Sequence, residues 1–211
     1  MERCKWNKIE NNPLYQEYHD NEWGVESHDE KYLFEMLILE SFHCGLSWLL
    51  VLKKRESFRK AFDGFDVDKV AAYGEAKIAT LLNDKAIIRN KAKILAAIAN
   101  AQAFIKVQSE FDSFDKYIWS FTSGKVVYSD SEMSLDSGQP LALGQPLASG
   151  KPLNSGKPLS KNDLSDKVAK DLKKRGFKFM GSVTTYSFLE AIGVMNNHIR
   201  TCFRYKVHRT D

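Results

Sequence analysis

The chain has 211 residues, of which 43% are hydrophobic and 12% aromatic, and it carries a formal net charge of +4. This composition excludes an intrinsically disordered chain and allows a buried core. The longest apolar stretch, residues 46–52, is interrupted by Ser47 and falls far short of the ~20 residues of a membrane-spanning helix; an apolar secretory signal is also missing from the N-terminus. We therefore expect a single-domain cytoplasmic monomer that does not enter a membrane.

The first 60 residues predict an arm followed by two helices. Residues 1–27 are rich in aromatics and turn signals, so we expect an extended arm with short helical turns. From Asp29 to about Glu40 apolar residues occupy nearly every face of a helical pattern, which predicts a helix buried on most sides. Gly45 interrupts the pattern, and Ser47 is placed to cap a second helix.

The helical period continues through the middle of the chain. Asp66 can cap a short helix over 67–73, and Asp84 can cap a long helix that runs to about residue 107. Apolar residues at i, i+3, i+4 and i+7 spacing predict a further helix over 113–121.

Two segments after this helix lack helical periodicity. Residues 126–128 have the composition of a strand, but no partner strand is evident, so we assign them to a loop. Residues 134–160 contain a six-residue repeat with Gly and Pro in every unit. A solenoid is one interpretation; since Pro removes a backbone donor and Gly adds chain entropy, we expect an exposed loop insertion within one domain spanning 1–211.

The C-terminal part predicts two helices joined by a short hairpin, with Gly176 at the end of the first helix and the second over about 182–192. A glycine-containing turn before a helix exposes backbone amides that can hold a phosphate. Residues 165–211 hold ten Lys/Arg against four Asp/Glu, a net of +6, which leaves −2 for residues 1–164. The alternative is an ordinary helical hairpin with a solvated basic edge.

Glu40 is a carboxylate on an otherwise apolar helix face, three, four and seven residues after Leu37, Met36 and Leu33. Burial without a partner would raise its pKa, whereas a cationic or hydrogen-bonding ligand would stabilise its charged form. The alternative is that the helix frays at Ser41 and Glu40 reaches water.

The N-terminal segment also holds a set of aromatic residues around Glu40: Trp6, Tyr18, Trp23 and Trp48. Their rings could stack a nucleobase, and a cationic base would gain roughly 0.5–2 kcal/mol over an indole face. The alternative is that these rings fill the core.

Cys4, His19, His198 and Cys202 are candidate metal ligands. The spacing of four between His198 and Cys202 would place both on one face of a helix. Two thiolates and two imidazoles suit one tetrahedral zinc ion that leaves no position for a catalytic water, so such an ion would be structural. The spacing of Cys4 and His19 is no established ligand signature, and burial is the alternative.

Several unusual sequence blocks occur together: Met1-Glu-Arg-Cys-x-Trp6, Tyr18-His-Asp-Asn-Glu-Trp-Gly24, Leu39-Glu40, Gly45-Leu-Ser-Trp48, Leu52-Lys-Lys-Arg-Glu56, Ile87-Ile-Arg-Asn-Lys-Ala-Lys-Ile94 and Lys174-Arg-Gly-Phe-Lys-Phe179. In these blocks the chain resembles the 3-methyladenine-DNA glycosylase I family, over about residues 1–132 and 161–205.

The resemblance implies an all-α helix-hairpin-helix glycosylase fold in which a structural zinc ties the N- and C-terminal ends into one lobe. It implies that Glu40 is the catalytic and base-recognising residue within an aromatic pocket of Trp6, Tyr18 and Trp48. The residues expected at double-stranded alkylated DNA are Leu46, Lys174, Gly176, Lys178 and Gly181.

The implied activity is monofunctional hydrolysis of the N-glycosidic bond, without a lysine Schiff base, giving free 3-methyladenine and an abasic site. At Phe42 and Cys44 the chain departs from the glutamine and alanine that the family leads us to expect, which bears on selectivity. One alternative is a protein of the same fold that binds damaged DNA without cutting it, against which the presence of Glu40 and Trp48 argues. Another is a zinc hydrolase, which would need an open coordination position.

Overall fold

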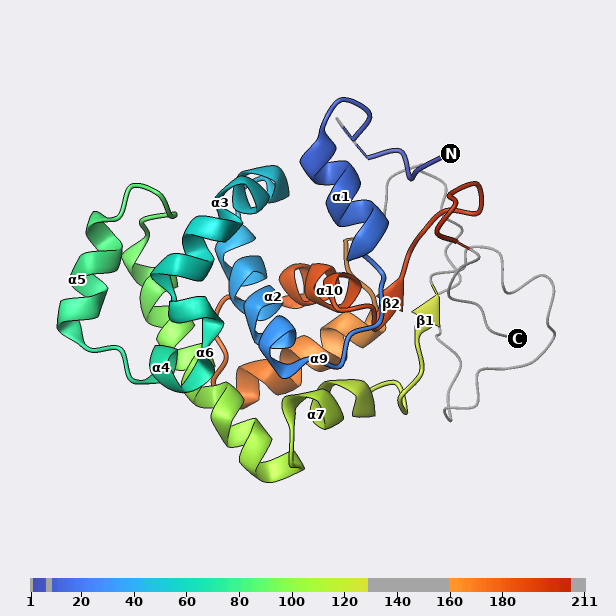
Figure 1. Cartoon of the computed structure of the whole chain (residues 1–211). Helices are drawn as coiled ribbons and strands as arrows, with labels where there is room; N and C mark the ends of the chain where they lie inside the picture. Colours follow the sequence, from blue (N-terminus) through green and yellow to red (C-terminus); the bar gives the residue numbers. More distant parts are fainter. Residues whose placement is uncertain (1, 7–8, 129–159, 206–211) are drawn as a thin grey trace.

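The computed structural model describes residues 2–6, 9–128 and 160–205, and its architecture is mostly helical (Figure 1). The α-helices are α1 (Pro13–Asn21), α2 (Glu30–His43), α3 (Trp48–Ala61), α4 (Val67–Ala71), α5 (Glu75–Asn83), α6 (Lys91–Phe111), α7 (Phe114–Ser120), α9 (Asp163–Lys174) and α10 (Ser182–Ala191). A short 3₁₀ helix, η1 (Asp63–Phe65), and two strands, β1 (Val127–Tyr128) and β2 (Met195–Asn196), complete the described elements. In the described part of the chain, no helix is long and apolar enough to cross a membrane.

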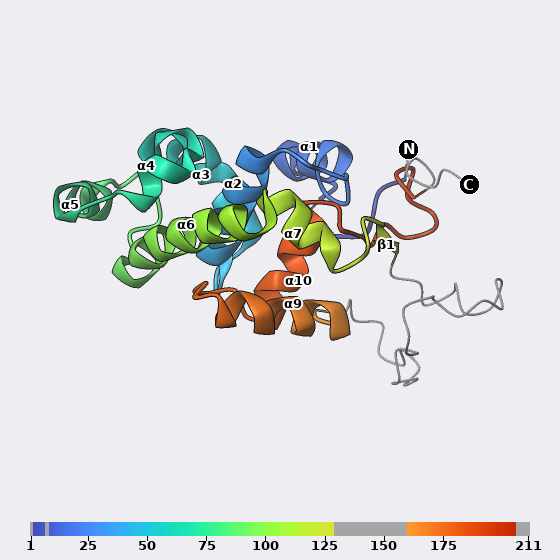
Figure 2. The same ribbon diagram turned by 90° about the horizontal axis from the view of Figure 1, so that it is seen from below.

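Helix α2 is the centre of the main core. Every residue from Leu33 to Phe42 is buried, and the helix packs against α3, α6, α7 and α10. The expectation of a helix covered on most sides is therefore confirmed, because neighbours on several faces bury its apolar residues. Figure 2 shows α1 and α3 on one side of α6, and α9 on the other.

Local capping explains where most helices begin. Oxygens of Asp29, Ser47, Asp66 and Ser113 accept hydrogen bonds from backbone amides in the first turns of α2, α3, α4 and α7. These side chains satisfy donors that have no partner within the helix. The starts predicted from Ser47 and Asp66 are thus confirmed.

The predicted helix start at Asp84 is wrong. Asp84 follows the last residue of α5, a helix that periodicity did not reveal, and its Oδ1 accepts from the amide of Ala86 at 2.8 Å. The long helix α6 begins at Lys91 instead, capped by Asn90, whose side chain accepts from the Lys93 amide at 3.1 Å. An aspartate side chain accepts hydrogen bonds from backbone amides in a turn as readily as at a helix start. For this reason Asp84 looks like a helix cap in the sequence although it lies in a turn.

Two other expectations need correction. The N-terminal arm contains a nine-residue helix, α1, which Asn12 caps and Pro13 opens. The segment assigned to a loop contains strand β1, which pairs in parallel with β2 through Val127–Met195 and Tyr128–Asn196. The repeat insertion at 134–160 lies outside the described residues, except for its last residue.

Helices α9 and α10 are joined by a short turn and pack against each other. Asn162 and Ser165 form a reciprocal capping box at the start of α9. Gly176 follows α9 with a φ of +98°, a conformation that strains other residues, and Gly181 occupies the N-cap position of α10. The helix, hairpin and helix predicted from the sequence are present.

Candidate functional site

Glu40 lies in the last turn of α2, and its side chain is only 3% exposed. The helix continues to His43, so the alternative in which it frays at Ser41 is wrong. Glu40 Oε2 accepts a hydrogen bond from His43 Nδ1 at 2.9 Å. Burial raises the pKa of Glu40, and the bond from His43 opposes that rise.

Trp48 stands beside this carboxylate region, at the start of α3. Its ring centroid lies 5.3 Å from that of Tyr18 and 5.4 Å from that of His43. The indole Nε1 of Trp48 is buried and has no hydrogen-bond partner within the described residues. A buried donor without a partner is rare in folded proteins and is typical of a site that a ligand completes.

Tyr18 is buried, and this burial raises the pKa of its hydroxyl; the nearby carboxylates of Glu40, Glu22 and Glu190 add to the rise. The phenol is therefore neutral and can donate or accept a hydrogen bond. Its position next to both Trp48 and the negative charge of Glu40 brings three of the sequence-predicted pocket residues together.

An aromatic cluster extends from this pocket to the chain ends. Its buried members are Cys4, Tyr18, Trp23, Leu52 and Cys202, and the partly buried Trp6, Leu14, Tyr15, Trp48 and Phe203 pack against them. Trp6 lies 4.6 Å from Trp23 and 6.3 Å from Tyr18, measured between ring centroids. Trp23 is 8% exposed, as expected of a core residue, whereas Trp6 and Trp48 keep partial access to solvent.

Cys4, His19, His198 and Cys202 are all buried, and their ligand atoms lie within 4.8 Å of one another. Cys202 Sγ lies 3.5 Å from His19 Nε2 and 3.4 Å from His198 Nδ1, and Cys4 Sγ lies 3.5 Å from the same His198 nitrogen. This Cys/His cluster could hold a metal ion. Burial raises the pKa of the Cys4 thiol to about 12, so its thiolate would need a cation nearby.

The outward-facing nitrogens of the cluster have partners of their own. His19 Nδ1 lies 2.8 Å from Asp20 Oδ1, and His198 Nε2 lies 2.9 Å from the carbonyl oxygen of Trp23. Such contacts fix a histidine's orientation and leave the other nitrogen for a metal. His198 and Cys202 lie in an irregular segment rather than on the expected helix, so that geometric argument was wrong although the two side chains do meet.

The backbone approaches the cluster closely at Gly24. This residue has a φ of +71°, and a Cβ placed there would lie 3.2 Å from the ring of His198. Only glycine combines that conformation with so little space.

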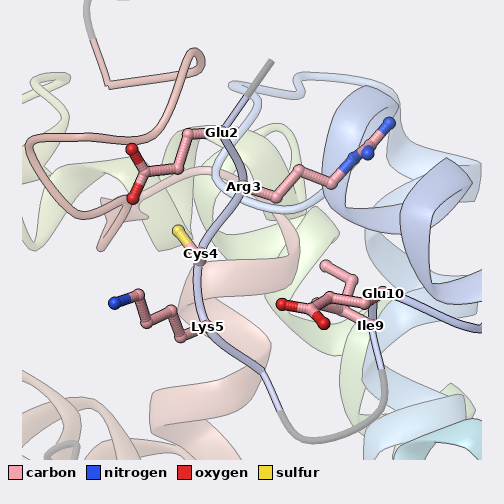
Figure 3. A pocket seen from close by; sticks show the side chains of 6 residues that line it. All are labelled: Glu2, Arg3, Cys4, Lys5, Ile9 and Glu10. Atoms are coloured by element: carbon pink, nitrogen blue, oxygen red, sulfur yellow. The ribbon is translucent and has the colours of Figure 1, made fainter.

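The N-terminal arm reaches the cluster alongside a hollow of about 300 Å³, lined by Glu2, Arg3, Cys4, Lys5, Ile9 and Glu10 (Figure 3). Arg3 extends from the arm to α1, where its Nε donates to Asp20 Oδ1 at 2.8 Å. None of the lining residues belongs to the predicted base pocket, so we assign no function to this hollow.

Leu46 lies on the turn between α2 and α3 and is 38% exposed. The turn is held by Lys93, whose Nζ donates to the carbonyl oxygens of Phe42 at 2.8 Å and Cys44 at 2.6 Å. Phe42 packs into the main core, 4.8 Å from Phe58 between ring centroids, and Cys44 is exposed. Packing into the core explains why Phe42 is tolerated so close to Glu40 in sequence.

The hairpin between α9 and α10 has exposed lysine side chains, and its backbone is hydrogen-bonded to helix α6. Lys174 and Lys178 are exposed, and no atom lies within 4 Å of a Cβ placed at Gly176 or Gly181. The amide of Lys178 donates to Asn100 Oδ1 at 2.7 Å, which fastens the hairpin to α6. Arg175, between these lysines in sequence, pairs with carboxylates of α6 and α9.

Sequence reasoning missed two ionisable residues near the pocket. His43 is one helical turn after Glu40, a spacing that could have indicated their contact. Glu190 is the single charged residue of helix α10 and follows the fully buried Phe188 and Leu189, a signal that could have drawn attention to it. Burial raises the pKa of Glu190 to about 8, the charge of Glu40 adds to the rise, and Asn197 Nδ2 donates to its Oε1 at 2.6 Å.

Comparisons with known proteins identify relatives over nearly the whole chain. The family described as methyladenine glycosylase matches residues 6–205. The chain is 42% identical over 205 residues to DNA-3-methyladenine glycosylase 1 of Escherichia coli (strain K12), covering 97% of each protein. A crystal structure of 3-methyladenine DNA glycosylase I matches with a TM-score of 0.79 at 40% identity, covering 96% of this chain and 98% of that one. The Staphylococcus aureus enzyme, in a structure concerned with 3-methyladenine recognition, matches with a TM-score of 0.79 at 35% identity, covering 94% and 95%.

Proposed function

Because this chain belongs to the methyladenine glycosylase family and is a hydrolytic glycosylase that excises 3-methyladenine from DNA, we propose that Glu40 and the rings around it recognise the methylated base. The observation that carries this proposal is the buried Glu40 carboxylate, linked through His43 to Trp48, whose indole N–H has no partner among the described residues. A buried negative charge and an unsatisfied donor are both costly until a suitable ligand binds.

The substrate itself supplies much of the driving force. Methylation at N3 gives adenine a positive charge, so when the N-glycosidic bond breaks, its electron pair neutralises the departing base. Water then adds to the sugar carbon and loses a proton, which leaves an abasic site. The enzyme must therefore flip the nucleotide, select the cation from an excess of normal adenine and stabilise an oxocarbenium-like sugar.

Glu40 provides the selection by charge. Burial raises the pKa of its carboxyl, and a cationic base at the carboxylate would lower that pKa and stabilise the ionised form. Neutral adenine offers no such compensation. The ring faces of Trp48 and Trp6 add roughly 0.5–2 kcal/mol each for a cation that stacks on them.

We infer that DNA is held by two further surfaces. Leu46, exposed on the turn after α2, would enter the duplex where the flipped nucleotide leaves it. The hairpin would act as a helix-hairpin-helix motif, with the amides around Gly176 and Gly181 and the side chains of Lys174 and Lys178 on phosphates. We propose one glycosylase domain over 1–211, with the 134–160 segment as an insertion, acting as a cytoplasmic monomer on double-stranded alkylated DNA.

We propose that the Cys/His cluster binds one structural Zn²⁺. With Zn–S near 2.3 Å and Zn–N near 2.0 Å, a tetrahedral ion places sulfur and nitrogen ligands about 3.5 Å apart. Three of the four sulfur to nitrogen distances in the cluster are 3.4 to 3.5 Å, and all four ligand atoms lie within 4.8 Å of one another, which supports this assignment. Four protein ligands leave no position for a catalytic water, which also argues against a zinc hydrolase.

The test of the pocket is release of free 3-methyladenine from methylated DNA by Glu40→Gln. We expect a loss of about 100-fold or more in single-turnover rate, because the amide cannot offer the charge that favours the cation. Glu56→Gln, the same change at an exposed residue of α3, is the control and should match the unsubstituted protein.

Unchanged release by a folded Glu40→Gln variant would remove Glu40 from the mechanism. The alternative of a protein that binds damaged DNA without cutting it predicts retention of the lesion in the DNA and no free base from the unsubstituted chain. The same assay therefore tests both.

The hairpin proposal has a separate test in the salt dependence of DNA affinity. Lys174→Ala should weaken binding to all sequences alike and reduce the slope of log K against log salt by about one. Lys60→Ala, at the end of α3 away from Trp48, should leave the slope unchanged. Equal slopes for both variants would remove Lys174 from the phosphate contacts.

A further inference from the structure

His43 connects the two sides of the pocket. It is the last residue of α2, and its Nδ1 lies 2.9 Å from Glu40 Oε2. Its ring stands edge-on to Trp48, with centroids 5.4 Å apart and planes at 62°. The His43 side chain is 28% exposed and that of Glu40 is 3% exposed, so His43 lies between the buried carboxylate and solvent.

The bond to Glu40 has a defined direction. An ionised carboxylate only accepts hydrogen bonds, so with Glu40 ionised for a cationic base, Nδ1 of His43 must be the donor in this 2.9 Å contact. No other hydrogen bond to the Glu40 carboxylate is found in the described parts of the chain. Solvent is largely excluded, so His43 supplies the compensation that water would give an exposed carboxylate.

We propose that His43 is a positioning residue that fixes Glu40 for base recognition. By holding Oε2, it fixes the rotation of the carboxylate and leaves Oε1 for a polar hydrogen of the methylated base. The inference rests on the proposed role of Glu40 and adds a second residue to it.

The competing explanation is that His43 only packs against Trp48. Two substitutions separate the donor from the ring. His43→Asn loses the ring but places an amide nitrogen where Nδ1 stands, bonded to Cγ in both residues. His43→Phe keeps a ring against Trp48 and has no donor.

The experiment measures single-turnover release of 3-methyladenine from methylated DNA, and binding of free 3-methyladenine by tryptophan fluorescence. For His43→Phe we expect a loss of about 10- to 100-fold in both, the range for removing a hydrogen bond to a charged group. His43→Asn should stay within about threefold of the unsubstituted protein, since the donor is retained. A packing role predicts the opposite order, which would overturn the proposal.

A double substitution distinguishes failure of this inference from failure of the proposed pocket. If His43 acts through Glu40, adding His43→Phe to Glu40→Gln should cause no further loss. An independent, additive loss would contradict the positioning role. An impaired Glu40→Gln variant beside an active His43→Phe variant would overturn the inference alone, whereas an active Glu40→Gln variant would overturn the pocket assignment.

A measurement on the unsubstituted protein covers the case in which His43→Phe does not fold. Imidazole ¹⁵N resonances of His43, assigned by difference from His43→Asn, should report protonated Nδ1 in the free protein. A proton on Nε2 alone would overturn the proposal, since His43 could not then donate to Glu40.

Discussion

The Cys/His cluster and the pocket around Glu40 border the same aromatic cluster. They differ in how many of their buried polar atoms have a partner among the described residues. In the Cys/His cluster the four ligand atoms face one another, and both histidines have a partner for the remaining nitrogen. In the pocket, Glu40 has one hydrogen bond and the Trp48 indole N–H has none within the described residues. A closed, self-complementary set is what a permanent ion requires, whereas unpaired groups are what a transient ligand requires.

The two regions are mechanically joined although their chemistry differs. Tyr18 and His19 are neighbours on α1, the first facing Trp48 and the second facing Cys202. Trp23 packs on His198, with ring centroids 4.6 Å apart, and on Trp6 at the same separation. The Cys/His cluster should therefore hold the pocket wall in place without taking part in recognition.

The largest expected effect comes from disrupting the Cys/His cluster. Removing the metal with a chelator, or replacing Cys202 by Ser, should lower the free energy of unfolding by about 3 kcal/mol or more, because a site that forms only on folding contributes its binding energy to stability. Urea unfolding measures it. Cys44→Ser is the matched control, since Cys44 is exposed and lies outside the cluster. Equal stability of chelated and untreated protein would refute a structural ion.

An intermediate effect concerns Glu190, whose pKa burial raises from an ordinary 4.5 to about 8. Between these values the folded chain keeps a proton that the unfolded chain has lost, so the free energy of unfolding falls as pH rises. Glu190→Gln removes this titration. Its free energy of unfolding, compared with that of the unsubstituted protein at the same pH, should be higher above pH 8 than below pH 4.5 by on the order of 2–4 kcal/mol. Urea unfolding at both pH values measures the difference. A pH-independent difference would contradict the assignment.

The smallest expected effect separates recognition from stability. Trp48→Phe removes an indole N–H that has no partner in the part of the chain that the structure describes. The free energy of unfolding should therefore change by less than about 1 kcal/mol while affinity for free 3-methyladenine falls several-fold. Trp119→Phe is the contrast, because Trp119 Nε1 donates to the carbonyl of Ser27 at 3.2 Å. That variant should lose stability and keep affinity. Reversed outcomes would show that the unpaired donor is not a recognition group.

Local chemistry made much of the fold predictable. Caps such as Ser47 and Asp66 act on amides within a few residues, so sequence alone locates the helices that they begin. The pairing of β1 with β2 joins residues 68 positions apart, for which no local pattern exists. Asp84 failed for the opposite reason, because an aspartate satisfies a turn as readily as a helix start.

The sequence identified the types of residue in the site but not the contacts between them. Glu40 stood out as a carboxylate on an apolar face, yet whether it was buried depended on the length of α2 and on the neighbouring Trp48. The four members of the Cys/His cluster were identified by residue type, while an irregular segment replaces the expected helix between His198 and Cys202. His43 was overlooked because a histidine at a helix end is common, and only its distance to Glu40 distinguishes it.

The Cys/His cluster joins residue 4 to residue 202, which has a consequence for biosynthesis. All residues from 4 to 202 must leave the ribosome before the four side chains can meet, and closing so long a loop carries an entropic cost that packing elsewhere in the chain must offset. The main core is itself complete only once Met195 of β2 is available, so the Cys/His cluster and the core form at nearly the same stage. Competence to recognise a lesion then arises only when residues from both ends of this span have folded together.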